Sequence, residues 1–98
     1  MVNYTSTHLD NVFSALADPT RRAVLTRLRA GEQSIGTLAD PFGMSLTGFI
    51  KHIHILEEAG LIERNKVGRV VNCRLKGGAL KAAMKWLDHH EAFWNTQF

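Results

Sequence analysis

The chain has 98 residues, of which 45% are hydrophobic and 8% aromatic, and its formal net charge is +3. This length supports one small domain, and the apolar content provides a core and excludes an intrinsically disordered chain. A net charge of this size does not by itself indicate a nucleic-acid partner, so the distribution of the basic residues is more informative. We see no basic segment followed by an apolar run at the N-terminus and no stretch of eighteen apolar residues, so neither a secretory signal nor a membrane span is predicted.

The first third of the chain reads as two helices. One apolar stripe predicts a helix over about residues 8–17 and consists of Leu9, Val12, Phe13 and Leu16. Asp18 is a good N-cap and Pro19 suits a first helical position, so a second helix is predicted over about 19–30, ending at Gly31. Four arginines of the second helix are expected to be available to solvent or to an anion: Arg21, Arg22, Arg27 and Arg29.

The middle of the chain, about residues 34–60, reads as a short helix, a turn and a longer helix. Ser34 caps the short helix, and we expect it to end at Asp40-Pro41 because the residue before a proline is disfavoured in the helical region. Ser45 caps the longer helix, and Gly60 is a natural left-handed C-cap. The buried face of the longer helix is predicted to consist of Phe49, Ile53 and Leu56.

The pattern then changes to alternation of apolar and polar residues. LIERNK and RVVNCRL, joined through Val67-Gly68, predict a β-hairpin, or wing, over about residues 61–76. After Gly77-Gly78, helical spacing returns over about residues 79–96. We therefore predict a mainly α fold with a small β-hairpin: a single winged helix-turn-helix domain spanning residues 1–98.

The basic residues are concentrated on the predicted hairpin. Five of them lie between positions 64 and 76 with no acidic residue among them: Arg64, Lys66, Arg69, Arg74 and Lys76. Such a distribution favours contact with a phosphate backbone. The alternative is a charged sheet edge that discourages pairing with another sheet.

The polar face of the longer helix lies opposite its buried face. Thr47, Lys51 and His54 can donate to or accept from base edges, and Ser45 with the helix N-terminus can bind a phosphate. The alternative is an ordinary solvated helix face. The full set of predicted DNA-binding residues is Ser45, Leu46, Thr47, Ile50, Lys51, His54, Arg64, Lys66 and Arg69.

Three stretches carry a resemblance to a known family: ALADPTRRAVLTRLRAGEQSIGTLAD, MSLTGFIKHIHILEEAGLIERNKVGRVVNCRL and WLDHHEAFW. Together, from about Phe13 to Trp94, they resemble the ArsR-type (ArsR/SmtB) family of bacterial winged-helix repressors. The resemblance implies a homodimer, paired through its first and last helices, that sits on a pseudo-palindromic operator. Two positions depart from the family pattern: Ile50 stands where a small polar residue is usual, and Gly48 where alanine is usual. These departures bear on which operator is read.

A pairing surface is also expected from the apolar residues. One small core cannot easily cover the aromatic residues Phe13, Trp86, Phe93, Trp94 and Phe98, and exposed apolar patches usually mark an interface. The predicted dimer-interface residues are Leu9, Val12, Phe13, Leu80, Met84, Leu87 and Trp94.

No metal site and no cofactor are predicted. Asp88, His89, His90 and Glu91 are adjacent on one helix, where neighbours point about 100° apart and cannot all converge on an ion. The arrangement of Trp86, Leu87, Phe93 and Trp94 resembles a branch of the family with no recognised metal site. Pairing of His8 with His90 across a dimer, giving a metal-responsive repressor, stays an alternative.

A single cysteine, Cys73, excludes an internal disulfide and fits a reducing cytoplasm, the expected location. Its basic neighbourhood suggests a reactive thiol, and the alternative is a small hydrophobic residue in a strand. We find no nucleophile–base pair, no glycine-rich phosphate loop and no metal quartet, so an enzyme is not predicted. The expected partners are double-stranded DNA and a second copy of the chain, with no membrane and no small-molecule substrate. A winged-helix protein-interaction module without specific DNA binding is the main alternative.

Overall fold

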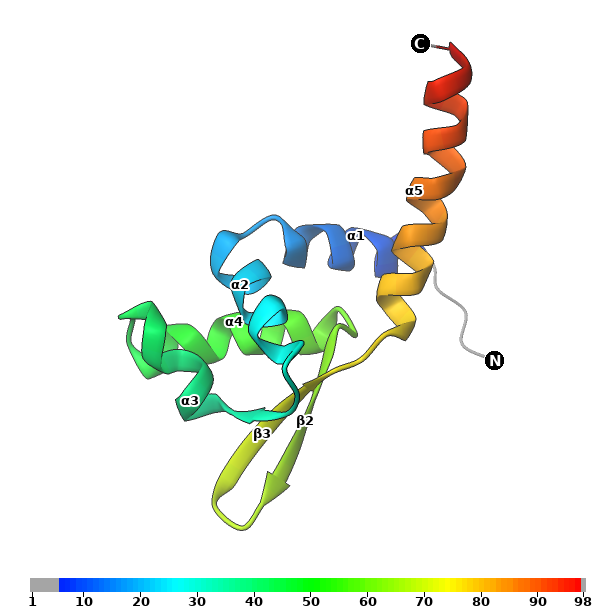
Figure 1. The fold of residues 1–98 in the computed structure, drawn as a ribbon. Helices are drawn as coiled ribbons and strands as arrows, with labels where there is room; N and C mark the ends of the chain where they lie inside the picture. The colour runs from blue at the N-terminus through cyan, green and yellow to red at the C-terminus, as the bar shows by residue number, and fades with distance from the viewer. Residues whose placement is uncertain (1–5, 98) are drawn as a thin grey trace.

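The computed structural model describes residues 6–97 and consists mainly of helices with a small sheet (Figure 1). This agrees with the predicted fold class. The elements, in chain order, are α1 (Ser6–Leu16), α2 (Pro19–Leu28), β1 (Gln33–Ser34), α3 (Ile35–Ala39), the 3-10 helix η1 (Asp40–Phe42), α4 (Leu46–Glu58), β2 (Ile62–Val67), β3 (Val70–Leu75) and α5 (Gly78–Gln97).

The three predicted N-caps are confirmed. The side chain of Asp18 accepts a hydrogen bond from the Arg21 backbone N–H at 3.0 Å. Ser34 accepts from the Thr37 N–H at 3.1 Å, and Ser45 accepts from the Gly48 N–H at 3.1 Å. Each oxygen satisfies a backbone donor that the first helical turn would otherwise leave unpaired.

The short helix ends where predicted, with Ala39 as its last residue, but the predicted reason for this end is wrong. Asp40 keeps helical dihedral angles (φ −51°, ψ −47°), and the chain continues into η1 before Gly43, at φ +62°, reverses it. Proline is tolerated in a first helical turn because its fixed φ is helical and its missing N–H has no partner there. Pro41 therefore lies in the first turn of η1, which begins at Asp40.

The sheet has three strands in the order β1-β3-β2, all antiparallel to their neighbours. The predicted hairpin is present, and a two-residue turn at Gly68-Arg69 joins Val67 to its partner Val70. Strand β1, which pairs Gln33 with Cys73 and Ser34 with Asn72, was not predicted. Since β1 immediately precedes α3, this pairing attaches the helix-turn-helix to the wing.

The core lies between the helices and the base of the sheet. Its fully buried large side chains are Phe49, Leu38, Ile53, Leu56, Leu61, Ile62, Val12, Val24 and Cys73. The prediction for Val12 is wrong in one respect: it is 1% exposed within its own chain, so it has almost no surface to offer a second copy. Residues 9, 12, 13 and 16 form one stripe, and its centre faces the core.

Two arginines of α2 turn back toward α1. Arg22 Nη1 donates to the Leu16 carbonyl at 2.8 Å, and Arg21 Nε donates to the Ala15 carbonyl at 2.8 Å. Arg22 is exposed, as expected, although it donates this hydrogen bond, whereas Arg21 is half-buried and less available than expected. They satisfy carbonyl groups at the end of α1, where the helix dipole favours positive charge.

The last helix is the longest element and extends away from the body. α5 has 20 residues, and its C-terminal half projects on the side opposite to the tip of the wing (Figure 1). Its first half packs against α1, where the rings of Phe13 and Trp86 meet edge to face at 5.7 Å. None of the helices between residues 6 and 97 combines the length and the apolar content needed to cross a membrane.

Candidate nucleic-acid interface

Helix α4 separates a buried apolar face from an exposed polar one. Phe49, Ile53 and Leu56 are each 0% exposed, as predicted, and they fix the helix against the core. Ser45 caps its N-terminus, and the C-terminus is followed by Gly60 in the left-handed region, with φ +77°. An added Cβ at Gly60 would also lie 3.2 Å from the Cβ of Ala79, so both the backbone angle and the close approach favour glycine.

The opposite face of α4 is presented to solvent. Thr47, Lys51 and His54 are exposed, and Ile50 at the edge of this face is half-buried. Leu46 in the first turn is 56% exposed. The structure thus brings the six predicted DNA-binding residues of this segment to one end and one side of α4, although their contact with DNA stays a prediction.

The wing supplies the second part of the surface. Gly68 adopts φ +62° in the two-residue turn, which puts Arg69 at the tip of the hairpin. Lys66 and Arg69 are both exposed. A cationic tip on a projecting hairpin (Figure 1) suits contact with a phosphate backbone beside a groove.

Ion pairs reduce the free positive charge of the wing. Arg64 Nε lies 2.9 Å from Glu57 Oε1, so the first wing strand is tied to the last turn of α4. Arg74 pairs with Glu63 on the neighbouring strand. Neither acidic partner was expected from the run of five basic residues in the sequence. The Glu63–Arg74 pair was detectable, because these residues face each other in the hairpin register that the two-residue turn imposes.

The surface predicted to pair two chains is partly exposed. On α5, Leu80, Met84, Leu87 and Trp94 are between 38% and 57% exposed, and Phe93 is 59% exposed. On α1, Leu9 and Phe13 are half-buried against the core. Val12 is excluded by its burial, and Phe98 lies outside the described residues.

A family model described as a helix-turn-helix domain matches residues 16–65. The transcriptional repressor SdpR of Bacillus subtilis is 32% identical over 79 residues, which cover 81% of this chain and 88% of SdpR. A crystal structure of an ArsR family transcriptional regulator superimposes with a TM-score of 0.88 at 43% identity, covering all of both chains. The chain belongs to the ArsR family of transcriptional regulators.

Two further structures extend the comparison. An ArsR-like transcriptional regulator from Rhodococcus sp. RHA1 is 35% identical, with a TM-score of 0.77 over 93% of this chain and 86% of that one. The homodimeric winged helix-turn-helix domain of a Mycobacterium bovis protein has a TM-score of 0.68 over 100% of this chain and 98% of its own. At 23% identity the latter supports the fold alone. The predicted family and fold are therefore confirmed.

Family membership determines the class of function. ArsR-family proteins are transcription regulators with a helix-turn-helix DNA-binding domain and not enzymes, in agreement with both predictions. In this ArsR-family chain, α3 and α4 are the helices of that motif, and β2 and β3 are its wing.

The histidines of α5 are arranged for packing in this structure. The His90 ring stacks on Trp86 with the ring centres 3.9 Å apart, and its Nδ1 lies 2.8 Å from the Trp86 carbonyl. Among residues 6–97, no group of three or more histidine, cysteine or acidic side chains is placed to hold a metal ion.

Cys73 is a buried strand residue. It is 0% exposed at the centre of β3, and burial raises the pKa of its thiol. A thiol with a raised pKa is mostly protonated at neutral pH and reacts slowly. The interpretation as a small hydrophobic residue is therefore favoured over a reactive one.

Proposed function

We propose that this ArsR-family chain is a homodimeric repressor that reads an inverted-repeat operator in double-stranded DNA. The observation that carries the proposal is the division of α4 into a fully buried face and an exposed face bearing Thr47, Lys51 and His54. A helix held in this way presents the same side chains to a major groove in every bound molecule.

The wing adds contacts that do not depend on base sequence. Lys66 and Arg69 are exposed near the tip, and each phosphate that a cation neutralises releases a counterion. These contacts set affinity and orientation, while side chains of α4 set sequence preference. The name of the relative SdpR, a transcriptional repressor, supports repression as the outcome.

The exposed apolar stripe of α5 supports pairing. Met84, Leu87 and Trp94 are about half exposed, which is unusual for large apolar side chains on one helix. The M. bovis domain, which shares this fold, is homodimeric, and we extend that state to this chain as part of the proposal. A two-fold dimer places two copies of α4 about 34 Å apart, one turn of B-DNA, and so matches an inverted repeat. Its expected location is the cytoplasm.

Selection from random duplexes tests the proposal. The purified chain should enrich an inverted repeat whose half-sites are centred about 10 base pairs apart. Lys51→Ala should change the preferred bases within each half-site, while Lys85→Ala, an exposed lysine of α5, should select the original motif. Failure to retain any duplex at low salt would contradict DNA binding and favour a protein-interaction module.

A further inference from the structure

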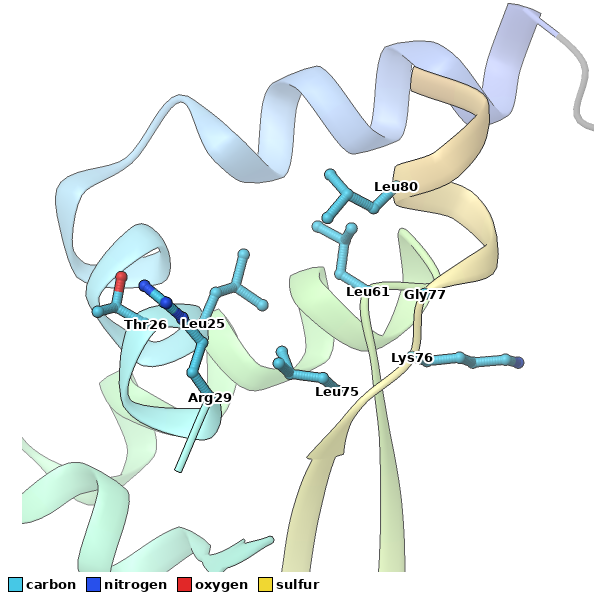
Figure 2. Close-up of a pocket in the computed structure, with 8 residues that line it drawn as sticks. All are labelled: Leu25, Thr26, Arg29, Leu61, Leu75, Lys76, Gly77 and Leu80. Atoms are coloured by element: carbon cyan, nitrogen blue, oxygen red, sulfur yellow. The ribbon is translucent and has the colours of Figure 1, made fainter. Parts of the chain in front are cut away.

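Most of the large apolar side chains exposed in the described part of the chain have neighbours or a proposed role. Those of α5 form the proposed pairing surface, and Val67 faces Val70 across the tip of the wing. Leu75, at the end of β3, lines an apolar pocket with leucines of α2 and α5 (Figure 2). The other two, Leu46 and Ile55, lie on α4. Because α4 belongs to the DNA-binding motif, duplex DNA is the partner to consider for them.

Leu46 and Ile50 form an apolar flank at the N-terminal end of α4. Leu46 is the first residue of the helix and is 56% exposed, and Ile50, one turn later, is half-buried. Residues four apart lie on the same face of a helix. Glu57 lies on this side as well, about three turns beyond Leu46, and its ion pair with Arg64 shows that this side faces the wing. The apolar flank is therefore on the wing-facing side of α4.

The apolar flank lies in the part of a recognition helix that meets base edges. In a helix-turn-helix, the N-terminal residues of the second helix contact bases in the major groove. The first turn of α4 has no acidic side chain that would repel the phosphates. Neither Leu46 nor Ile50 can form a hydrogen bond with a base through its side chain. The apolar group that base edges present in the major groove is the C5-methyl group of thymine.

We propose that the apolar flank reads thymine: Leu46 and Ile50 contact the C5-methyl group of a thymine at a fixed position in each half-site. This inference rests on the proposed function and specifies which base the operator carries there. Cytosine at the same position offers no methyl group, and its N4 amino group would lose water beside the flank without gaining a hydrogen bond. Thr47, Lys51 and His54 remain available for hydrogen bonds to the neighbouring bases.

Replacement of thymine by uracil tests the contact, because it removes the C5-methyl group alone. The duplex is the one that the full chain enriches from random sequences, and fluorescence anisotropy measures its affinity with uracil at each thymine position in turn. At the position read by the flank, uracil should weaken binding about fourfold in one half-site and about 15-fold in both, as expected for loss of one buried methyl group from each. At that position, 5-methylcytosine should bind about fourfold more tightly than cytosine. Equal affinity for thymine and uracil at every position would overturn the proposal.

Matched variants assign the methyl contact to the flank. In Leu46→Ala and Ile50→Ala, the ratio of thymine to uracil affinity should fall toward one, because each variant removes the partner of the methyl group. Ile55→Ala removes an exposed isoleucine that points about 180° away from Leu46 on the same helix, and it should keep the original ratio. A ratio of two affinities does not change if a variant is partly unfolded. The same ratio in all four chains would mean that the methyl group acts through the stiffness of the duplex, and the assignment would fail.

Failure of the proposed function gives a different result. If the chain retains no duplex at low salt, DNA binding itself fails before any bases are compared. If the chain binds duplexes but does not distinguish thymine from uracil, DNA binding stands and the reading of thymine fails. A contact of Leu46 with deoxyribose in place of the base would give this second result, because uracil leaves the sugar unchanged.

Discussion

The guanidinium of Arg21 in α2 lies 3.1 Å, through Nη1, from Nδ1 of His52 in α4. The same side chain donates from Nη2 to the Ser14 carbonyl at 3.1 Å and from Nε to the Ala15 carbonyl of α1. Since a guanidinium has only donors, Nδ1 of His52 is the acceptor and its proton resides on Nε2. Arg21 thereby links its own helix, α2, to both α1 and α4.

Arg21→Met should lower the free energy of unfolding by about 1–3 kcal/mol, because partly buried carbonyl groups lose a charged donor. Chemical denaturation with urea measures this change. Lys85→Met, an exposed residue of α5, serves as the control and should change stability by less than about 0.5 kcal/mol. If both variants change the free energy of unfolding by similarly small amounts, the contacts of Arg21 do not stabilise the fold.

Asp18 should make stability depend on pH in the acid range. The backbone N–H of Arg21 donates to the carboxylate, and this hydrogen bond is the main reason that the pKa of Asp18 lies below its usual 3.8. A lowered folded-state pKa gives a contribution that is fully present above the unfolded-state pKa and is lost as pH falls through the folded-state pKa. Asp18→Ala should cost about 1 kcal/mol at neutral pH, and the difference should shrink below pH 3.8.

Asp18→Asn separates the cap from the titration. Asparagine caps a helix about as well as aspartate but does not ionise in this range. Its stability should stay near that of the original chain at neutral pH, and its acid dependence should be weaker. Thermal unfolding between pH 2 and 7 measures both differences, and identical pH profiles for all three chains would contradict the assignment.

Arg69→Ala should weaken binding to all duplexes to a similar degree, because a phosphate contact carries no base information. The slope of log K against log salt concentration should become shallower by about 0.9. Fluorescence anisotropy over a salt series gives both quantities. An unchanged slope would remove the tip of the wing from the DNA contact.

Glu57→Gln should have the opposite effect. Arg64 lies 2.9 Å from this carboxylate, so loss of the negative charge releases a wing cation toward the phosphates. We expect affinity to rise by a few-fold at low salt and the salt dependence to steepen by up to about 0.9. Glu58→Gln makes the same change in net charge at the neighbouring exposed position; an equal gain there would show that the ion pair is irrelevant.

Trp94→Ala should shift the chain toward monomer in sedimentation equilibrium, because it removes one of the large exposed aromatic side chains near the end of α5. Asn95→Ala, at the next exposed position, should leave the association constant unchanged. Trp86 is unsuitable for this test because its ring contacts Phe13 of the same chain at 5.7 Å. A Trp94→Ala variant that associates as strongly as the original would place the pairing surface elsewhere.

Local signals in the sequence were sufficient for the elements of the site. Ser34, Ser45 and Gly60 are capping residues whose chemistry depends on their immediate neighbours, and all three have the predicted roles. The spacing of Phe49, Ile53 and Leu56 likewise identified the buried face of α4, and thereby its exposed face.

The features that were missed depend on contacts between distant segments. Strand β1 has two residues, too few to show an alternating pattern, and it exists only because β3 lies beside it. Charge counting assigned Arg64 to the DNA surface without Glu57, which the fold brings to it from α4. Val12 was predicted to lie on the pairing surface because it belongs to the apolar stripe of α1. The sequence pattern alone does not reveal which residues of such a stripe are buried in the chain's own core.

The length of α5 has a mechanical consequence. Its 20 residues form a rod of about 30 Å, since each residue adds 1.5 Å along the axis. A tilt of about 10° at the root of such a lever moves its far end by about 5 Å, more than the roughly 3.4 Å between successive nucleotides of a strand. In a dimer paired through α5, a small change of the angle between α5 and the rest of the domain would therefore shift the two copies of α4 away from their half-sites.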